Sequence, residues 1–312
     1  MEITGGSITI VSGKHGIHCD EALTISHGTV NITKSFEGLE ARTMEISGGD
    51  ISIAASDDGL NAVDSDSGTE ADGWGWRFGG TGEAQEGVYI LISGGKLTVN
   101  ASGDGIDSNG DLTITGGEVY VSGPTSDGDG ALDYAGTGTI TGGTIVAAGS
   151  SGMAQSLSSD TQGVVFLTLS GTQSAGSAVT LTDADGAVLA SFMPEKAYSS
   201  VVISAPGMKS CGTYTVVCGS ESRSVTLEGF TYSEGGFGGF GGGMPGGMGG
   251  GFGGDLPDGD FNGERPDGDF SGERPDGTPP SGFDGSKPNG APPAGFSGGS
   301  GGQGQSAGRP AL

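Results

Sequence analysis

A short motif recurs six times along the first half of the chain and restricts its fold more than any other feature. It reads Leu-Thr-Ile-x-Gly-Gly-x-Val-x-Val, followed by a polar stretch and then Asp-Gly-Ile or Asp-Gly-Leu. Most steps between repeats are 21 or 22 residues, with the second glycine of the pair at Gly6, Gly28, Gly49, Gly95, Gly117 and Gly143. A repeat this short cannot bury its own apolar face, so the repeats are expected to stack on one another.

Apolar and polar residues alternate within each repeat, which is the pattern of a β-strand. Leu97 and Val99 show it on one side of a Gly-Gly pair, and Leu112 and Ile114 show it before the next pair. Three short strands joined by glycine-rich corners describe one coil of a parallel β-helix. Parallel crossover connections are almost always right-handed. The sequence therefore predicts an all-β, right-handed parallel β-helix, and it shows neither helix-forming patterns nor the spaced leucines of a leucine-rich repeat.

The composition divides the chain into three parts. Residues 1–160 hold the coils, interrupted by an insertion at about 64–87. Residues 161–232 lose the Gly-Gly repeat and read as six further strands, with a hairpin signal at Asp185-Gly186. This part is expected to form a small β-sandwich or a cap over the end of the β-helix. Residues 233–312 are rich in Gly, Pro and Asp and are predicted to be a disordered tail.

The charge of the chain is strongly negative, with 38 acidic residues against 12 basic ones and a net charge of −26. This balance argues against nucleic acid and anionic membranes as partners and favours a cation. No segment has the apolar length of a membrane span. The three cysteines, Cys19, Cys211 and Cys218, have no metal-binding spacing and receive no role.

The sequence starts at Met1 almost inside a coil, whereas a β-helix needs a cap at its end. We therefore expect the chain to be a fragment of a longer secreted protein whose export signal precedes it. This places the protein outside the cell or at the cell surface, where the tail is a candidate for association with the cell envelope.

Acidic residues gather at one corner of successive coils. Aligned on the turn glycine, one expected column holds Glu37, Asp58, Asp104 and Asp129, and a second, three residues further on, holds Glu40, Asn61, Asp107 and Asp133. With the adjoining acids, the full set of predicted metal ligands is Glu37, Glu40, Asp57, Asp58, Asn61, Asp104, Asp107, Asp127, Asp129 and Asp133. His15 and His18 take the same corner in the first coil and are interpreted as solvated turn residues.

Stacked carboxylates of this kind favour a bound cation. Neighbouring coils lie about 4.8 Å apart, and two ionised carboxylates at that distance repel by roughly 3.5 kcal/mol at an effective dielectric constant of 20. Ca²⁺ suits the corner because it takes six to eight oxygen ligands in flexible geometry, whereas Mg²⁺ demands a stricter octahedron. Zinc is not expected, since no Cys/His cluster is visible. The alternative is that Asp-Gly pairs make turns and that Asp caps the corner backbone.

The insertion carries both tryptophans of the chain. Trp74, Trp76 and Arg77 are candidate sugar-binding residues, because aromatic rings stack on apolar sugar faces and Arg pairs with a uronate carboxylate. The alternative is that the rings fold back as a lid on the flank of the β-helix.

Several of these motifs, taken in order, resemble a family of secreted bacterial carbohydrate-binding domains that is similar to polysaccharide lyase family 9. The matching segments are Asp57-Asp58-Gly-Leu-Asn, Gly103-Asp104-Gly-Ile-Asp-Ser-Asn-Gly-Asp and Asp127-Gly-Asp-Gly-Ala-Leu-Asp-Tyr. The resemblance covers about residues 3–230 and implies a right-handed β-helix, calcium at the acidic corners, and cellulose or an acidic, pectin-like polysaccharide as partner. It implies calcium ligands at Asp57, Asp58, Asn61, Asp104, Asp107, Asp129 and Asp133. The corners with Glu37 and Glu40 and with His15 and His18 depart from the pattern.

Three functions remain compatible with the sequence. The first is a calcium-binding module that binds polysaccharide without catalysis. The second is a calcium-dependent uronate lyase, which needs a basic residue to abstract a proton; Lys34 is the best available base, although a solvated Lys is the favoured interpretation. The third is a structural or adhesive surface protein whose coils are held together by calcium.

Overall fold

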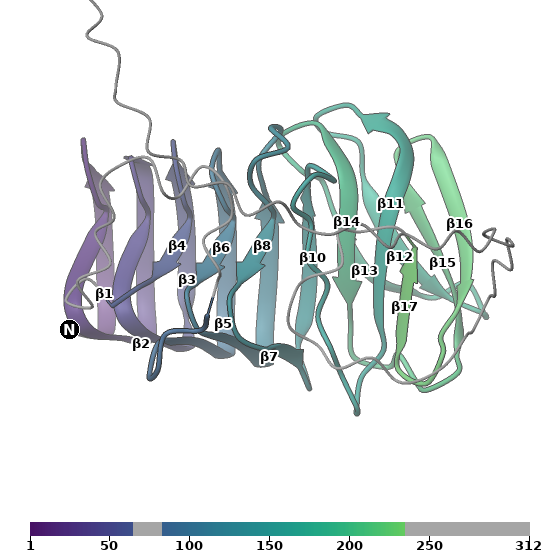
Figure 1. Ribbon diagram of the computed structural model, residues 1–312, viewed down its shortest axis with the longest axis horizontal. Helices are drawn as coiled ribbons and strands as arrows, with labels where there is room; N and C mark the ends of the chain where they lie inside the picture. Colours follow the sequence, from purple (N-terminus) through teal and green to yellow (C-terminus); the bar gives the residue numbers. More distant parts are fainter. Residues whose placement is uncertain (65–82, 235–312) are drawn as a thin grey trace, which may run out of the picture. The chain divides into compact units, whose positions relative to one another are not determined.

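The computed structural model describes residues 1–64 and 83–234, and every regular element in these ranges is a β-strand (Figure 1). The insertion residues Trp74, Trp76 and Arg77 and the tail from residue 235 lie outside the described residues. The first ten strands form the stacked coils, and the other seven follow them.

The coil strands are of two lengths. Long strands bend through the Gly-Gly corner and so combine two of the three predicted strands, while the short strands have three residues each. The long ones are β1 (Glu2–Val11), β2 (Ile17–Ser35), β3 (Leu39–Ala55), β5 (Tyr89–Ala101) and β7 (Asp111–Ser122). The short ones are β4 (Leu60–Ala62), β6 (Ile106–Ser108), β8 (Leu132–Tyr134) and β9 (Gly138–Ile140), and β10 (Thr144–Gly149) completes the stack.

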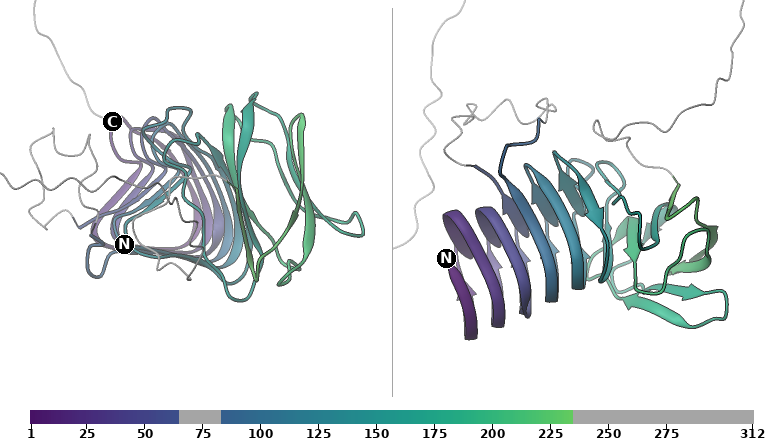
Figure 2. Two further views of the ribbon diagram at one scale, coloured as in Figure 1. Left: turned by 45° about the vertical axis from the view of Figure 1, so that its right-hand side comes forward. Right: turned by 90° about the horizontal axis from the view of Figure 1, so that it is seen from below.

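Every pairing between successive coils is parallel, which confirms the predicted β-helix of about six turns (Figure 2). The register places each apolar residue beside its equivalent one coil later: Met44 pairs with Ile90, and Ile90 pairs with Leu112. These inward side chains are fully buried. Ile8 and Ile10 in the first coil are only half-buried, because β1 pairs with a single strand, β2.

Glycine is required at the two kinds of corner for different physical reasons. The second glycine of each Gly-Gly pair has a left-handed backbone, as at Gly117 with φ of 84°. The glycine of the acidic turn is required by close stacking instead. A Cβ on Gly59 would lie 2.3 Å from Val99 Cγ1 and 2.5 Å from the carbonyl oxygen of Gly105 in the next coil.

Most of the C-terminal strands pair antiparallel, and β17 (Thr231–Glu234) alone adds to its neighbour in parallel. β14 (Tyr198–Ser204) lies between β10 and β11 (Val164–Gln173) and is antiparallel to both, and β17 adds to β11. A separate four-stranded antiparallel sheet has the order β13–β12–β15–β16. Its strands are β12 (Val179–Asp183), β13 (Val188–Phe192), β15 (Thr213–Cys218) and β16 (Glu221–Thr226).

The strands β10, β14 and β11 belong to two hydrophobic cores at once. In β11, Phe166 faces the coil core, whereas its neighbour Leu167 faces the core of the second layer. Figure 2 shows the two layers of C-terminal strands beside the coils. The alternatives of a cap and a sandwich are thus both realised, since the last coil sheet supplies one layer of the sandwich.

Most of the C-terminal strand predictions are confirmed. The hairpin at Asp185-Gly186 joins the antiparallel strands β12 and β13, and Gly186 has a φ of 83°. β17 is missing from the sequence prediction, because its four residues, Thr231–Glu234, adjoin the glycine-rich tail and carry only a brief apolar signal.

Candidate metal and carbohydrate site

The backbone of the acidic corner stacks in register from coil to coil. The amide of Gly38 donates to the carbonyl oxygen of Asp58 at 2.9 Å, and the amide of Gly59 donates to that of Asp104 at 2.9 Å. The side chains follow the same direction. Asp58 Oδ1 accepts a hydrogen bond from the amide of Asp104 at 2.7 Å, and Asp104 Oδ1 accepts one from the amide of Gly130 at 2.6 Å. These aspartates therefore cap the backbone of the next coil, which is the alternative to metal binding that the sequence allowed for Asp-Gly corners.

The second predicted column is confirmed residue by residue. Glu40 pairs with Asn61, Asn61 with Asp107, and Asp107 with Asp133 along the short strands β4, β6 and β8. His18 precedes Glu40 in the same column. The corner thus carries one polar side chain per coil over five coils.

The expected position of Asp129 in the first column is wrong by one residue. The amide of Gly105 donates to the carbonyl oxygen of Gly130, and that of Ile106 donates to Ala131. The extra residue of this coil therefore puts Gly130 in register with Asp104. Asp129 turns toward its own loop, where Ser126 Oγ donates to its Oδ2 at 2.9 Å.

Three carboxylates of the corner converge. One oxygen each of Asp58, Asp104 and Asp107 lies within 4.8 Å of the others. Gly103 allows this approach, since a Cβ there would lie 2.4 Å from Asp58 Oδ1 and 2.7 Å from Asp57 Oδ1. Of the other predicted ligands, Asp57 and Asp129 lie close enough to raise the pKa of Asp58, whereas Asp127 is exposed and lines a separate polar groove of about 370 Å³.

Burial and mutual repulsion raise the pKa of every carboxyl group in this cluster. Burial is the main cause at Asp58, with the charge of Asp57 next, and brings its pKa to about 7. Burial likewise raises the pKa of Asp104 to about 8, against the lowering effect of the hydrogen bond from Gly130. The pKa of Asp107 is raised well above its ordinary value, chiefly by burial and then by Asp104.

The residues of this cluster fit a hard divalent cation. Asn61 Oδ1 is buried beside Asp107 in the column and has no hydrogen-bond partner among the described residues. Three carboxylates and an amide oxygen form an all-oxygen donor set, which is the chemistry that Ca²⁺ takes. A cation there would offset the repulsion that raises the pKa values and would give Asn61 Oδ1 a partner.

Gln155 ends the column at its C-terminal side. Its Nε2 donates to Asp133 Oδ1 at 2.7 Å, and its Oε1 accepts from the amide of Tyr134 at 3.2 Å. Removing it leaves a half-buried carboxylate and an amide without these bonds. We expect Gln155→Ala to lower the free energy of unfolding by about 1–3 kcal/mol, measured by urea denaturation.

Gln155→Glu tests the same contact by charge. It places a second carboxylate next to Asp133, so its loss of stability should exceed that of Gln155→Ala at pH 8 and shrink in acid. Wild-type stability in both variants would show that Gln155 contributes nothing to this end of the column.

An open groove of about 580 Å³ lies at the corner that follows the acidic corner in the chain. It is lined by the segment that re-enters from the insertion, with Gln85, Val88 and Tyr89, and by Asp111 and Thr113 of β7. Its volume is within the range of ligand sites. The sequence predicted sugar binding at Trp74, Trp76 and Arg77, which lie outside the described residues, and did not point to Tyr89. The available signal was an aromatic residue at the boundary between the insertion and a strand.

The remaining candidate residues belong to neither the carboxylate cluster nor the groove. Lys34, the base considered for a lyase, is exposed. The three cysteines are free, and Cys211 and Cys218 form no bridge. Glu37 and Glu40 lie next to His15 rather than in the carboxylate cluster.

The family comparison gives the class of ligand. A family model described as carbohydrate-binding domain-containing protein matches residues 1–216, which include all the coils and most of the C-terminal strands. The chain belongs to this family. Carbohydrate is therefore the partner that family membership indicates, in agreement with the resemblance seen in the sequence.

Other comparisons add no relative. No curated protein and no solved structure matches the chain. Within residues 1–64 and 83–234, no helix has the length and apolar character needed to cross a membrane.

Proposed function

We propose that the protein binds an acidic, pectin-like polysaccharide through calcium held at the corner of Asp58, Asp104 and Asp107, without catalysis. The convergence of these three carboxylates beside the unpartnered Asn61 Oδ1 is the observation that supports calcium. Bound calcium would supply positive charge and ligand positions for the carboxylates of a uronate chain. Without a cation, the acidic corner would repel such a chain.

The groove beside Tyr89 offers a place for the sugar rings. It lies on the same coils as the acidic corner, since Gly110 and Asp111 in its lining follow β6 by only two or three residues. An aromatic ring at the rim of an open groove suits the apolar face of a sugar. The same proposal places the protein outside the cell, where calcium-binding modules typically have dissociation constants of about 0.1–1 mM.

Retention of the purified chain on immobilised polygalacturonate tests this function. We expect retention in calcium and its loss in excess chelator, with cellulose as the comparison for a neutral glycan. Asp107→Asn keeps the shape of a cluster ligand and should weaken retention about tenfold or more. Asp127→Asn removes an exposed acid outside the cluster and should leave retention unchanged.

Four outcomes would contradict the proposal. Retention that resists chelator, or equal retention of Asp107→Asn and wild type, would remove the calcium corner from the binding site. Ultraviolet absorbance from unsaturated product would instead support the uronate lyase alternative. Calcium-dependent self-association without retention on any glycan would favour the structural role.

A further inference from the structure

At the first coil, the acidic corner changes its chemistry. The amide of Gly16 donates to the carbonyl oxygen of Glu37, so His15 occupies the place that Asp58 and Asp104 hold in later coils. His18 pairs with Glu40 and occupies the place of Asp107. Two imidazoles therefore stand where the middle coils present carboxylates.

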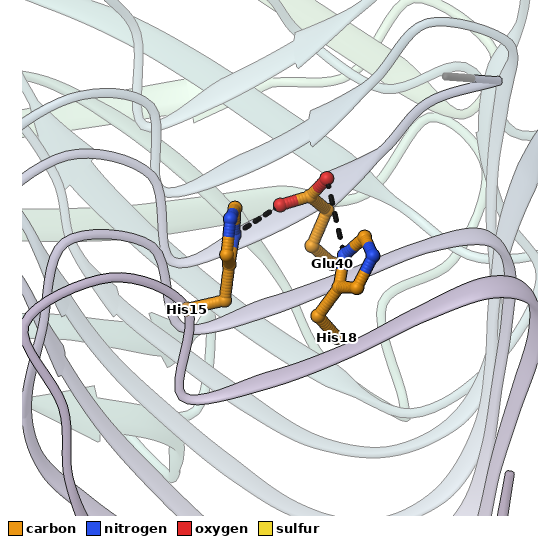
Figure 3. A group of neighbouring side chains, drawn as sticks. All are labelled: His15, His18 and Glu40. Carbon is orange, nitrogen blue, oxygen red and sulfur yellow. Dashed lines mark ion pairs between the residues drawn. The ribbon is translucent and has the colours of Figure 1, made fainter. Parts of the chain in front are cut away.

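The two rings face one carboxylate (Figure 3). His15 Nδ1 contacts Glu40 Oε2, and His18 Nδ1 lies 3.3 Å from Glu40 Oε1. The ring centroids are 5.0 Å apart, with the planes tilted by 39°. One ligand atom from each of the three residues lies within 4.8 Å of the others.

Glu40 is the buried member of this group. It is 8% exposed, and its two oxygens face the two imidazoles, with Oε2 against His15 Nδ1 and Oε1 3.3 Å from His18 Nδ1. A buried carboxylate needs polar partners in place of water. Here the partners are two imidazole nitrogens, and the three ligand atoms converge on one position where a cation can bind all of them.

We propose that His15, His18 and Glu40 form a site for a transition-metal ion, with Zn²⁺ as the ion of choice. Two imidazole nitrogens and a carboxylate oxygen are a normal zinc donor set. They are a poor match for Ca²⁺, which prefers oxygen ligands alone. This proposal differs from the expectation from sequence that zinc is not bound, because the side chains of His15 and His18 both face Glu40.

Neighbouring groups complete the arrangement. Asp20 Oδ1 lies 3.1 Å from His18 Nε2, so a carboxylate is placed to orient that ring while Nδ1 faces Glu40. Such carboxylate–histidine pairs are usual behind metal-bound imidazoles. Glu37 Oε2 lies 3.2 Å from His15 Nδ1 and is the nearest further oxygen ligand.

The ion would join two coils. His15 lies at the corner between β1 and β2, His18 lies at the start of β2, and Glu40 lies in β3. This is the part of the stack where the inward residues Ile8 and Ile10 are only half-buried. A metal there stabilises the least covered coil, and it does so whether or not the carboxylate cluster binds calcium.

Zinc binding by the untagged, metal-stripped full chain tests this inference. We expect calorimetry to show one strong Zn²⁺ site, and Co²⁺ at the same site to give a visible absorption band. His15→Asn, His18→Asn and Glu40→Gln should each weaken Zn²⁺ binding about tenfold or more. His27→Asn is the matched control, because His27 is exposed and lies outside the group. It should bind Zn²⁺ like wild type.

The carboxylate cluster provides an independent check. Asp107→Asn should leave Zn²⁺ binding intact, and millimolar Ca²⁺ should not displace Zn²⁺. The zinc site can therefore be tested independently of the calcium proposal. His18 is partly exposed, and its variant gives a readout if Glu40→Gln fails to fold. Absence of zinc binding in wild type, or an equal loss in His27→Asn, would overturn the inference and leave a metal-free ion pair.

Discussion

Without divalent cations, the protein should lose stability as the pH rises from about 5 to 8. The unfolded pKa of Asp58 and Asp104 is near 3.8, whereas the folded values are about 7 and about 8. The folded state therefore binds more protons than the unfolded state in this window, so raising the pH favours unfolding. A shift of three units in a single group corresponds to roughly 4 kcal/mol, and the coupled groups do not add in full.

Calcium should remove most of this loss. A ligand that binds only the folded state adds about 2.7 kcal/mol at 100 times its dissociation constant. Urea denaturation at pH 5, 6.5 and 8, with calcium and with chelator, measures both effects. We expect the two curves to separate as the pH rises.

Asp107→Asn supplies the matched variant, with opposite effects in the two conditions. It removes a buried carboxyl group whose ionisation the fold disfavours, so it should raise stability at pH 8 in chelator. It also removes a ligand, so it should reduce the gain from calcium. Asp127→Asn should change neither. A wild-type stability that is flat between pH 5 and 8 in chelator would show that the cluster does not carry this repulsion.

Gly59→Ala should destabilise the protein by about 3 kcal/mol, because its new methyl group has no room. The Cβ would meet Val99 Cγ1 inside the core and the carbonyl oxygen of Gly105 in the next coil. To relieve the contact, the corner must separate from the next coil, which stretches the bond from the amide of Gly59 to Asp104. Because Asp58 and Asp104 move with that corner, calcium binding should weaken as well.

Gly128→Ala is the control for this substitution. Gly128 belongs to the longer corner of the fifth coil, it is exposed, and a Cβ there meets nothing within 4 Å. Its unfolding free energy should stay within about 0.5 kcal/mol of wild type. Equal stability of both variants would contradict the close stacking of the turn glycines.

The fold was accessible from sequence because stacking repeats every physical requirement once per coil. The inward pair Ile90 and Ile92 is one instance of a pattern that neighbouring coils confirm, so one irregular coil does not hide it. Position within the corner was harder to predict. The one extra residue in the fifth coil leaves its acidic residues recognisable in the sequence but moves Asp129 out of register. Only the backbone hydrogen bonds to Gly130 and Ala131 reveal this shift.

The histidine group was missed for a different reason. His15 and His18 were judged by their own turn, where a polar ring beside glycine suggests solvent exposure. The residue that changes this is Glu40, 22 positions later than His18 and adjacent to it only through the coil register. The alignment on the turn glycine already places His18 one coil before Glu40, but it does not show that both imidazoles face that carboxylate.

The reversal of chain direction at β14 has a consequence for how such proteins vary in length. In a parallel stack, each coil pairs with the preceding coil through one strand edge and leaves the other edge free for the next coil. Stacking alone therefore sets no limit on the number of coils. β14 is antiparallel to both β10 and β11, and no further coil can continue the stack past it. Length variation is therefore expected as whole units of 21 or 22 residues gained or lost ahead of β10, with the closing strands kept as a fixed terminus.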